Sequence, residues 1–205
     1  SSEVYGMAKE DEIPINETNP IRAANPYSIS KVGHDLMSQY YHKAYGLNIV
    51  ITRMFSHEGS RRGKEFALSS FAYQIAKGEK SGDYVVKHGN LESVRTYNHI
   101  DDAIEAYWLC SESDKYGEIY NIGGGSKNSI SLLELINILN KKMNKKNKFK
   151  KFRWRPGDQK IYISNILKIK KEHNWYPKIS LSEGLDKIIA WINKNEIIIK
   201  KTLKP

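Results

Sequence analysis

The chain has 205 residues, 40% of them hydrophobic, with four Trp and thirteen Tyr. This composition predicts a packed globular protein and excludes an intrinsically disordered one. The formal net charge is +10, but much of the excess lies in lysine-rich runs at 141–151 and 194–204. We expect these runs to be solvated and the protein to bind no nucleic acid. The single cysteine, Cys110, lies in an apolar stretch, so we expect a buried thiol and no intrachain disulfide.

The first half of the chain predicts alternating helices and strands. Asn25 can cap a helix over 26–45, Pro26 suits its first position, and Gly46 suits its end. The apolar run at 49–51 predicts a strand over 48–55 that is buried on both faces. The remaining elements expected here are a loop rich in Gly and Arg over 57–64, a helix over 66–77 and a strand over 84–88.

The second half continues this alternation, which predicts an α/β protein. Asp101 or Asp102 can cap a helix that ends near Ser111, and a strand follows over 118–122. Capping boxes at 131–134 and 180–183 predict two more helices, the first through about residue 142. No apolar run approaches the roughly 20 residues of a membrane span, so the default expectation is a soluble, cytoplasmic protein with no membrane partner.

Tyr27 and Lys31 lie four residues apart and therefore on one face of the first helix. A nearby ammonium favours the phenolate form, so it lowers the pKa of a tyrosine toward working pH. Such a pair can carry a proton in general acid–base catalysis. An exposed Tyr–Lys helix pair without a catalytic role is the alternative.

The surrounding motifs identify the pair. Ser-Ser-Glu-Val-Tyr-Gly at 1–6, followed by Asn-Pro-Tyr-x-x-x-Lys at 25–31, resembles the extended short-chain dehydrogenase/reductase family, also known as the NAD-dependent epimerase/dehydratase family. Further similar segments follow in the same order, at 53–57, 89–95, 101–102, 118–124 and 155–158.

The resemblance implies the C-terminal part of a Rossmann-type parallel sheet plus a smaller α/β substrate domain. Residues 1–56 and 95–122 would belong to the NAD(P)-binding domain, and 57–94 and 123–205 to the nucleotide-sugar domain. The chain contains no Gly-x-Gly-x-x-Gly cofactor motif. We therefore expect the C-terminal part of a longer enzyme, inactive when isolated and prone to form homo-oligomers through the surface that its missing strands would cover.

The resemblance also implies catalytic roles. Tyr27 would take a hydroxyl proton from the sugar, and Lys31 would lower the pKa of the Tyr27 phenol. Ser1 would bridge the substrate oxygen and Tyr27. Glu3 matches the base that removes the C5 proton in nucleotide-sugar 4,6-dehydratases, most closely those of the GDP-mannose type. A nucleotide-sugar epimerase, a 4-keto reductase and an inactive nucleotide-sugar-binding fragment are the alternatives.

Binding residues follow from the same resemblance, with NADP or NAD as cofactor, a nucleotide sugar (a GDP-sugar favoured) as substrate, and no metal. The expected cofactor-binding residues, besides Tyr27 and Lys31, are Phe55, His57, Arg61 and Arg62. The expected substrate-binding residues are Ser2, Ser56, Asn90, Arg95, Arg155 and Asp158. Adjacent guanidinium groups suit phosphate because they are planar and permanently charged.

Overall fold

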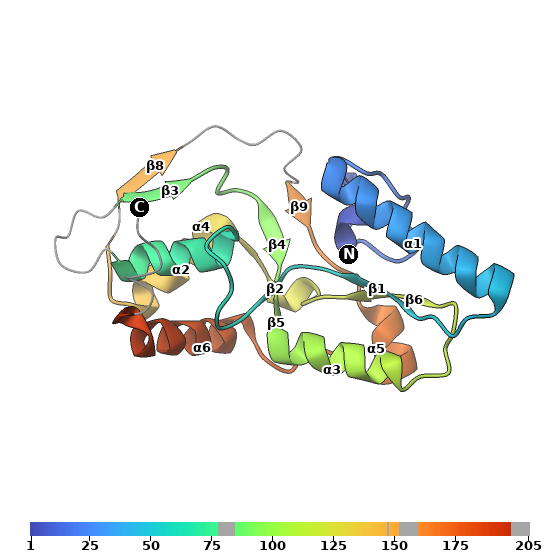
Figure 1. Ribbon diagram of the computed structural model, residues 1–205. Helices are drawn as coiled ribbons and strands as arrows, with labels where there is room; N and C mark the ends of the chain where they lie inside the picture. Colours follow the sequence, from blue (N-terminus) through green and yellow to red (C-terminus); the bar gives the residue numbers. More distant parts are fainter. Residues whose placement is uncertain (78–84, 147, 152–159, 198–205) are drawn as a thin grey trace.

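The computed structural model describes residues 1–77, 85–146, 148–151 and 160–197 (Figure 1). Its longest helix, α1, spans Pro26–Tyr45, as the sequence predicts. The Asn25 side chain accepts a hydrogen bond from the Ser28 backbone N–H, and the Ser28 side chain accepts one from the Asn25 N–H. At the other end Gly46 adopts the left-handed conformation, with φ 67°, which glycine tolerates without strain. Both ends of α1 are therefore determined by local chemistry.

Two parallel strand pairs form the centre of the molecule. Strand β1 (Ile51–Met54) pairs with β6 (Ile119–Ile122), and the next strand β2 (His57–Glu58) pairs with β5 (Asn98–His99). Helix α3 (Ile100–Ser111) and helix α5 (Leu167–His173) pack against β1 and β6. The resulting core contains Met54, Ala103, Ala106, Cys110, Tyr120, Ile122, Ile169 and Trp175, so Cys110 is buried as expected.

A second core lies among three helices on the left of Figure 1. They are α2 (Ala67–Lys77), α4 (Leu132–Lys142) and α6 (Leu181–Lys194). The expected caps at Ser131 and Ser180 are confirmed, since each side chain accepts a hydrogen bond from the backbone N–H three residues later. Beside these helices the strands β3 (Val85–His88) and β8 (Lys148–Lys151) pair in parallel.

A three-stranded sheet, the fourth sheet in the described residues, joins distant parts of the chain. Strand β4 (Val94–Thr96) runs antiparallel to β7 (Ser129–Ser131) and parallel to β9 (Ile161–Tyr162). Tyr162 of β9 packs with Val4, Tyr5, Ile15 and Phe55 in a small core at the 3-10 helix η1 (Ser2–Tyr5). Two other 3-10 turns, η2 (Glu10–Glu12) and η3 (Ser126–Asn128), complete the described elements.

The glycine run at 123–125 forms a loop, and the packing around its middle residue, Gly124, explains why a glycine is needed there. A Cβ on Gly124 would lie 2.0 Å from the carbonyl oxygen of Tyr97. The loop therefore passes against the segment between β4 and β5 with no room for a side chain.

The prediction for the start of α3 is wrong. The helix is capped by His99, whose ring nitrogen accepts from the Asp101 backbone N–H, while Asp101 and Asp102 lie in the first turn. The strand expected over 48–55 is shorter, and the loop expected over 57–64 begins with β2. Residue 84 lies outside the described residues. The sequence analysis also missed the short strands β4, β5, β7, β8 and β9, and the helix α5.

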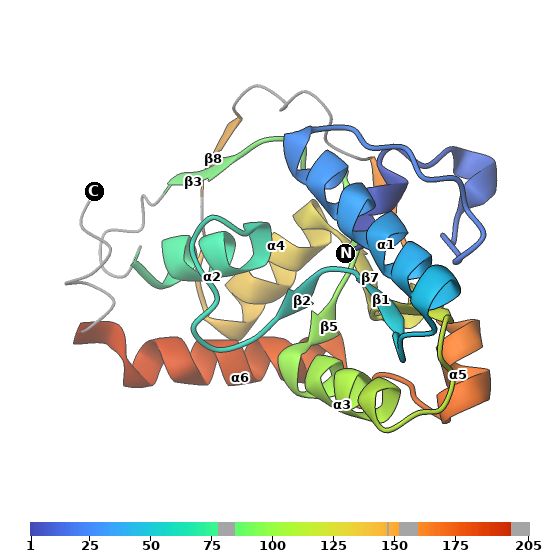
Figure 2. The same cartoon turned by 45° about the vertical axis from the view of Figure 1, so that its right-hand side comes forward.

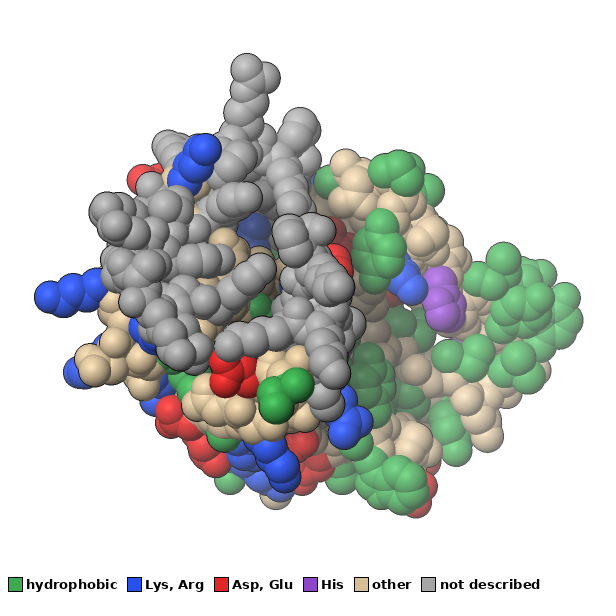
Figure 3. Space-filling model, turned by 60° about the vertical axis from the view of Figure 1, so that its left-hand side comes forward, with side chains coloured by type: hydrophobic (Ala, Val, Ile, Leu, Met, Phe, Trp, Pro, Cys, Tyr) green, Lys and Arg blue, Asp and Glu red, His purple; other side chains and the backbone are tan. Residues whose placement is uncertain are grey.

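Helix α1 lies on the opposite side of β1 and β6 from α3 and α5 (Figures 1 and 2). Its two buried residues, Ser28 and Asp35, are both polar, whereas most of its apolar side chains are exposed (Figure 3). No helix in the described part of the chain has the length and apolar character needed to cross a membrane.

Candidate active site

A cleft of about 400 Å³ lies between α1 and β1. It brings together four residues that the sequence analysis singled out, Ser1, Tyr27, Lys31 and His57. Its other lining residues are His34, Asp35, Ser38, Val50, Ile51, Thr52, Met54 and Tyr107. One wall is a helix, one a strand, and Tyr107 comes from α3, so only the tertiary fold assembles the site.

Tyr27 and Lys31 occupy successive turns of α1 at this cleft. The Lys31 ammonium lies 5.4 Å from the centroid of the Tyr27 ring, and 56% of the Tyr27 surface is exposed. Ser1 lies beside them, and its Oγ accepts a hydrogen bond of 3.3 Å from the Glu3 backbone N–H. The cleft therefore contains a hydroxyl, a phenol and an ammonium. These groups can bind an alcohol and exchange a proton with it.

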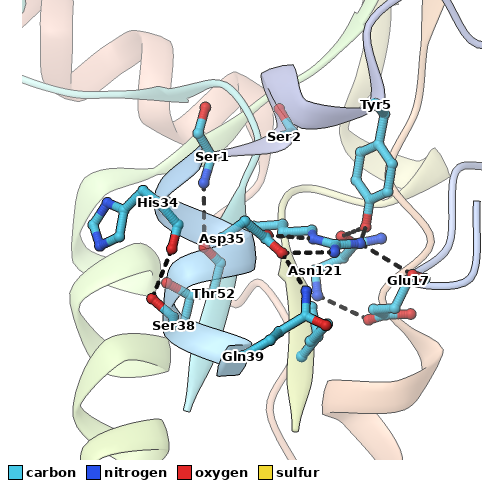
Figure 4. Close-up of polar contacts among 12 residues, drawn as sticks. Ser1, Ser2, Tyr5, Glu17, His34, Asp35, Ser38, Gln39, Thr52 and Asn121 are labelled. Carbon is cyan, nitrogen blue, oxygen red and sulfur yellow. Dashed lines mark hydrogen bonds and ion pairs between the residues drawn. The ribbon is translucent and has the colours of Figure 1, made fainter. Parts of the chain in front are cut away.

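A buried ion pair connects α1 to β1 beneath the cleft (Figure 4). Arg53 on β1 donates from Nε to one carboxylate oxygen of Asp35 (2.8 Å) and from one terminal nitrogen to the other (3.0 Å). Its second terminal nitrogen donates to the Tyr5 hydroxyl and to the Glu17 carbonyl, both at 3.0 Å. A two-pronged guanidinium–carboxylate contact defines both distance and direction. It therefore holds α1 at a defined rotation on β1.

The network extends to β6 and back to the N-terminal segment. The Tyr5 hydroxyl donates to the Asn121 side-chain oxygen (2.7 Å), and the Glu17 carboxylate accepts from the Asn121 backbone N–H (2.8 Å). Burial alone would raise the pKa of Asp35, but hydrogen bonds and charge from Arg53 outweigh it, so that pKa lies below its ordinary value. Burial raises the pKa of Tyr5 to about 12, which keeps its hydroxyl protonated as a donor.

Glu3 and Arg95 both act on the phenol of Tyr162. Tyr162 is buried, and its hydroxyl donates to the Ser2 carbonyl oxygen. Burial raises the pKa of Tyr162, the Glu3 carboxylate raises it further, and the Arg95 guanidinium opposes both. Arg95 on β4 is the pairing partner of Tyr162 on β9, and the Tyr162 hydroxyl contacts Ser2, the residue before Glu3 on η1. Neither Glu3 nor Arg95 is among the lining residues of the cleft.

His57 is held in place at the end of the cleft. Its Nδ1 lies 3.3 Å from the Phe55 carbonyl oxygen, and Arg62 lies 3.4 Å from its Nε2. Burial lowers the pKa of His57, the contact with the Phe55 carbonyl opposes this, and the positive Arg62 adds to the lowering. The imidazole is therefore neutral at pH 7 and accepts from Arg62.

The two arginines expected to bind cofactor differ in environment. The Arg62 guanidinium carbon lies 3.4 Å from the centroid of the Phe66 ring, and its Nε lies 4.0 Å from the Glu58 carboxylate. Arg61 is exposed and has a left-handed backbone, with φ 69°. Arg62 thus supports the loop from within, whereas Arg61 faces solvent.

Other predicted site residues have mainly local contacts. The Phe55 ring is buried between Tyr5 and Tyr162, with centroid distances of 6.2 and 5.2 Å, so only its backbone can face a ligand. The Ser56 carbonyl accepts from the Asn98 N–H, and the Asn90 side chain accepts from the Glu92 N–H. Arg155 and Asp158 lie outside the described residues.

Several residues of the cleft were not predicted from the sequence. Asp35 follows Lys31 by four positions, so the helical spacing that links Tyr27 to Lys31 could have indicated it. Thr52 and Met54 lie in the predicted strand, but nothing local indicates which face meets the helix. Tyr107 carried no signal, because α3 is separated from α1 by 54 residues of chain.

Comparison with known proteins identifies the family. Residues 1–188 match the family described as GDP-mannose 4,6 dehydratase. The chain belongs to this family. It is thereby a member of the extended short-chain dehydrogenase/reductase group, which confirms the resemblance seen in the motifs.

Two curated relatives illustrate the range of similar proteins. The chain is 28% identical over 196 residues to dTDP-glucose 4,6-dehydratase of Streptomyces griseus, covering 95% of this chain and 57% of the relative. It is 34% identical over 176 residues to UDP-glucuronate 4-epimerase of Thermodesulfobacterium geofontis (strain OPF15), covering 86% of this chain and 53% of the relative. The chain thus spans somewhat more than half the length of these relatives.

A solved structure confirms the fold class. The dTDP-glucose 4,6-dehydratase of Streptomyces venezuelae, with NAD and TYD bound, superposes with a TM-score of 0.84 at 29% identity. The match covers 96% of this chain and 59% of that one. The chain therefore has the α/β, Rossmann-type fold that the motifs predicted. The division into cofactor and substrate domains stays a prediction.

Proposed function

We propose that this protein acts as a nucleotide-sugar 4,6-dehydratase, converting a hexose nucleotide to its 4-keto-6-deoxy product. The observation that carries the proposal is the joint presence of Ser1, Tyr27 and Lys31 at one cleft. Glu3 follows Ser1 by two residues and lies in η1, which the Ser1 side chain caps. The family match over 1–188 and the Streptomyces griseus relative support the dehydratase class.

In this proposal each residue has a defined task. Tyr27 accepts the proton of the sugar C4 hydroxyl, with the Lys31 ammonium beside its ring. Ser1 donates a hydrogen bond to the same sugar oxygen. Once C4 is a ketone, the C5 proton is acidic because the resulting carbanion delocalises into the carbonyl. Glu3 removes that proton and transfers it to the C6 hydroxyl, which leaves as water.

The residues at the cleft suit one end of NAD or NADP. The Lys31 ammonium and the hydroxyls of Tyr27, Ser38 and Thr52 can bond a ribose, and Met54 offers an apolar contact for a ring. When bound, the cofactor supplies the acceptor for the C4 hydride and its return to C6. The Streptomyces venezuelae relative was solved with NAD. Arg61 is the exposed guanidinium available to a phosphate, while His57 and Arg62 brace the loop beside it.

We propose a GDP-sugar as the favoured substrate, because Ser-Ser-Glu at 1–3 and the arginine pair at 61–62 resemble the GDP-mannose type. Arg95 would bind the diphosphate. The residues proposed to contact the rest of the substrate are Ser2, Ser56, Asn90, Arg155 and Asp158. The relatives named for dTDP- and UDP-sugars make those nucleotides the first comparison substrates.

The second candidate is a nucleotide-sugar 4-epimerase, favoured by the relative that is 34% identical. Epimerisation at C4 uses the same Ser1, Tyr27 and Lys31 but requires no proton removal from C5. Glu3 therefore distinguishes the two reactions.

The test compares the chain alone with the chain joined to the cofactor-binding half of a relative. Both are incubated with GDP-mannose, dTDP-glucose and UDP-glucuronate, and 4-keto-6-deoxy sugar and C4 epimer are assayed. We expect the joined protein to form the 4-keto-6-deoxy product and the chain alone to be inactive. Glu3→Gln should lower that product at least about 100-fold, consistent with loss of a catalytic base. Glu92→Gln, at a second carboxylate, is the matched control.

An epimer product that survives Glu3→Gln would replace the dehydratase assignment with the epimerase. Binding of a nucleotide sugar by the chain, with no product from either protein, would favour a fragment that only binds.

A further inference from the structure

The proposed catalytic residues belong to two separate parts of the fold. Tyr27 and Lys31 lie on α1, whereas Ser1 caps η1, the 3-10 helix that carries Glu3. The proposed reaction needs groups from both parts on one sugar ring, so their relative position must be fixed. A contact that connects η1 to α1 therefore bears directly on the chemistry.

Tyr5, the last residue of η1, makes this connection through its hydroxyl (Figure 4). The hydroxyl accepts a hydrogen bond of 3.0 Å from Arg53 on β1 and donates one of 2.7 Å to the Asn121 side-chain oxygen on β6. The same guanidinium donates two hydrogen bonds to Asp35 on α1, at 2.8 and 3.0 Å. One side chain, that of Arg53, therefore contacts both η1 and α1.

Asp35 extends this constraint to the residues at the cleft. It follows Lys31 by four residues and Tyr27 by eight, so the three lie on successive turns along one side of α1. Asp35 also lines the cleft with them. Because α1 is a continuous helix, holding Asp35 in place fixes the directions in which Lys31 and Tyr27 point.

The ring and the hydroxyl of Tyr5 have separate roles. The ring is buried in the small core with Ile15 and Phe55, and the Arg53 guanidinium carbon lies 5.0 Å from its centroid. Apolar packing has no direction, whereas a hydrogen bond specifies one. Removing the hydroxyl alone should therefore leave the core filled but no longer hold η1 in a single orientation.

We propose that Tyr5 is a positioning residue for the proposed dehydratase reaction. Its hydroxyl holds η1 against Arg53, and through Arg53 against α1. Ser1 thereby keeps a fixed place relative to Tyr27 and Lys31. Tyr5 does not line the cleft, so it acts through these residues and not on the substrate. The effect on rate rests on the proposed function, whereas the effect on η1 can be measured separately.

The first test measures amide hydrogen exchange by NMR in the chain alone and needs neither substrate nor cofactor. The two reporter amides are the Gly6 N–H, which donates to the Glu3 carbonyl, and the Arg22 N–H, which donates to the Val4 carbonyl. We expect Tyr5→Phe to speed exchange at both amides at least about tenfold, because η1 opens more often without the directional hydrogen bonds. Unchanged exchange in folded Tyr5→Phe would overturn the proposal.

Tyr120→Phe is the matched control. Tyr120 is as deeply buried as Tyr5 and directly precedes Asn121 on β6, but its hydroxyl donates to Glu172 on α5 at 2.6 Å. The variant therefore loses a tyrosine hydroxyl on the opposite face of β6. We expect exchange at the two reporter amides to stay within about twofold of the natural chain. Equal acceleration in both variants would indicate general destabilisation and contradict the positioning role.

A second variant decides the matter if Tyr5→Phe does not fold. Arg53→Lys keeps a positive charge beside Asp35, but a lysine cannot make the two-pronged contact and also donate to the Tyr5 hydroxyl. It should speed exchange at the same two amides at least about tenfold. Unchanged exchange in this variant would overturn the proposal.

The second test measures kcat and KM in the chain joined to the cofactor-binding half of a relative, with the nucleotide sugar that this protein converts. We expect Tyr5→Phe to lower kcat at least about tenfold and to leave KM within about twofold, because it displaces reacting groups and removes no substrate contact. Tyr120→Phe should leave both unchanged. Faster exchange at the reporter amides with an unchanged kcat would reject the role in positioning. No product from the joined natural chain would instead reject the proposed function, and the exchange measurement would still decide whether Tyr5 holds η1.

Discussion

At the scale of single residues, the decisive contact is the pair formed by Arg53 and Asp35. Both side chains are almost fully buried, at 3% and 4% exposed. A buried charge is costly to desolvate, and the cost is offset only where geometry is good and the remaining hydrogen-bonding groups are used. Here Arg53 also bonds Tyr5 and Glu17. The pair therefore orients α1 more than it adds net stability.

Removing one partner of this pair should be strongly destabilising. We expect Arg53→Met to lower the free energy of unfolding by about 3–5 kcal/mol, because it leaves Asp35 buried without its counterion. Urea denaturation followed by circular dichroism measures this. The matched control is Lys142→Met, which removes a contact of 2.7 Å to the exposed Asp186 and should cost under about 1 kcal/mol. Equal losses in the two variants would contradict the assigned role.

Glu58 makes stability depend on pH in the opposite direction to an ordinary paired carboxylate. Burial raises the pKa of Glu58 to about 7, against opposition from Arg62 and Ser69. The folded protein therefore holds this proton at pH values where the unfolded chain releases it. The contribution is fully present below pH 4.5, the ordinary value, and is lost as the pH rises through 7.

We therefore expect Glu58→Gln to gain stability relative to the natural chain as the pH rises from 5 to 8. The shift from 4.5 to about 7 corresponds to about 3 kcal/mol at most. Denaturation curves at both pH values measure the difference. Glu92 is exposed, so Glu92→Gln serves as the control and should give no such pH-dependent gain in stability. An equally large gain in Glu92→Gln would show that Glu58 is not the cause of the pH dependence.

At the scale of elements, the position at which α1 begins depends on the hydrogen bonds of its first turn. Asn25 and Ser28 form a reciprocal cap, and Tyr27 lies between them at the cleft. The start of the helix therefore determines where the proposed proton carrier lies. The Arg53–Asp35 pair, two turns later, determines the rotation of the same helix.

Loss of the cap should be measurable without unfolding the protein. We expect Asn25→Ala to cost about 1 kcal/mol, because the Ser28 N–H loses its acceptor. Asn25→Asp keeps a side-chain oxygen and should lie within about 0.5 kcal/mol of the natural chain. Thermal unfolding of the three proteins measures the order, and identical losses for Ala and Asp would exclude a capping role.

At the scale of the whole molecule, α1 and α3 leave apolar side chains exposed on both sides of the cleft. The exposed residues are Ile29, Leu36, Met37, Tyr40, Tyr41 and Tyr45 on α1, with Ile104, Tyr107 and Trp108 on α3. Tyr40, Tyr41 and Tyr45 form a cluster with ring centroids 5.5–5.9 Å apart. Apolar surface of this extent favours association in water.

We propose that this surface makes the chain self-associate, and we expect a mass that rises with protein concentration in sedimentation equilibrium. Met37→Lys combined with Trp108→Lys should shift association to at least tenfold higher concentration, because it places charge on both helices. Leu167→Lys, at a residue of α5 that is equally exposed, should leave association unchanged. A monomer at all concentrations would contradict the expectation.

The sequence by itself determined the features that depend on neighbours along the chain. The bounds of α1, the caps at Ser131 and Ser180, and the Tyr27–Lys31 spacing follow from local hydrogen bonding and helical periodicity. The ordered motifs were sufficient to identify the family. Short strands such as β4, β5 and β7 were not predicted, because two or three residues are too few to show a hydrophobic period. Their pairing partners also lie far along the chain.

Only the tertiary structure decided which side chains meet. Asp35 and Arg53 are each common on a surface, and their burial as a pair depends on α1 docking on β1. Contacts between distant segments are set by packing and desolvation of the whole fold, so no local pattern records them.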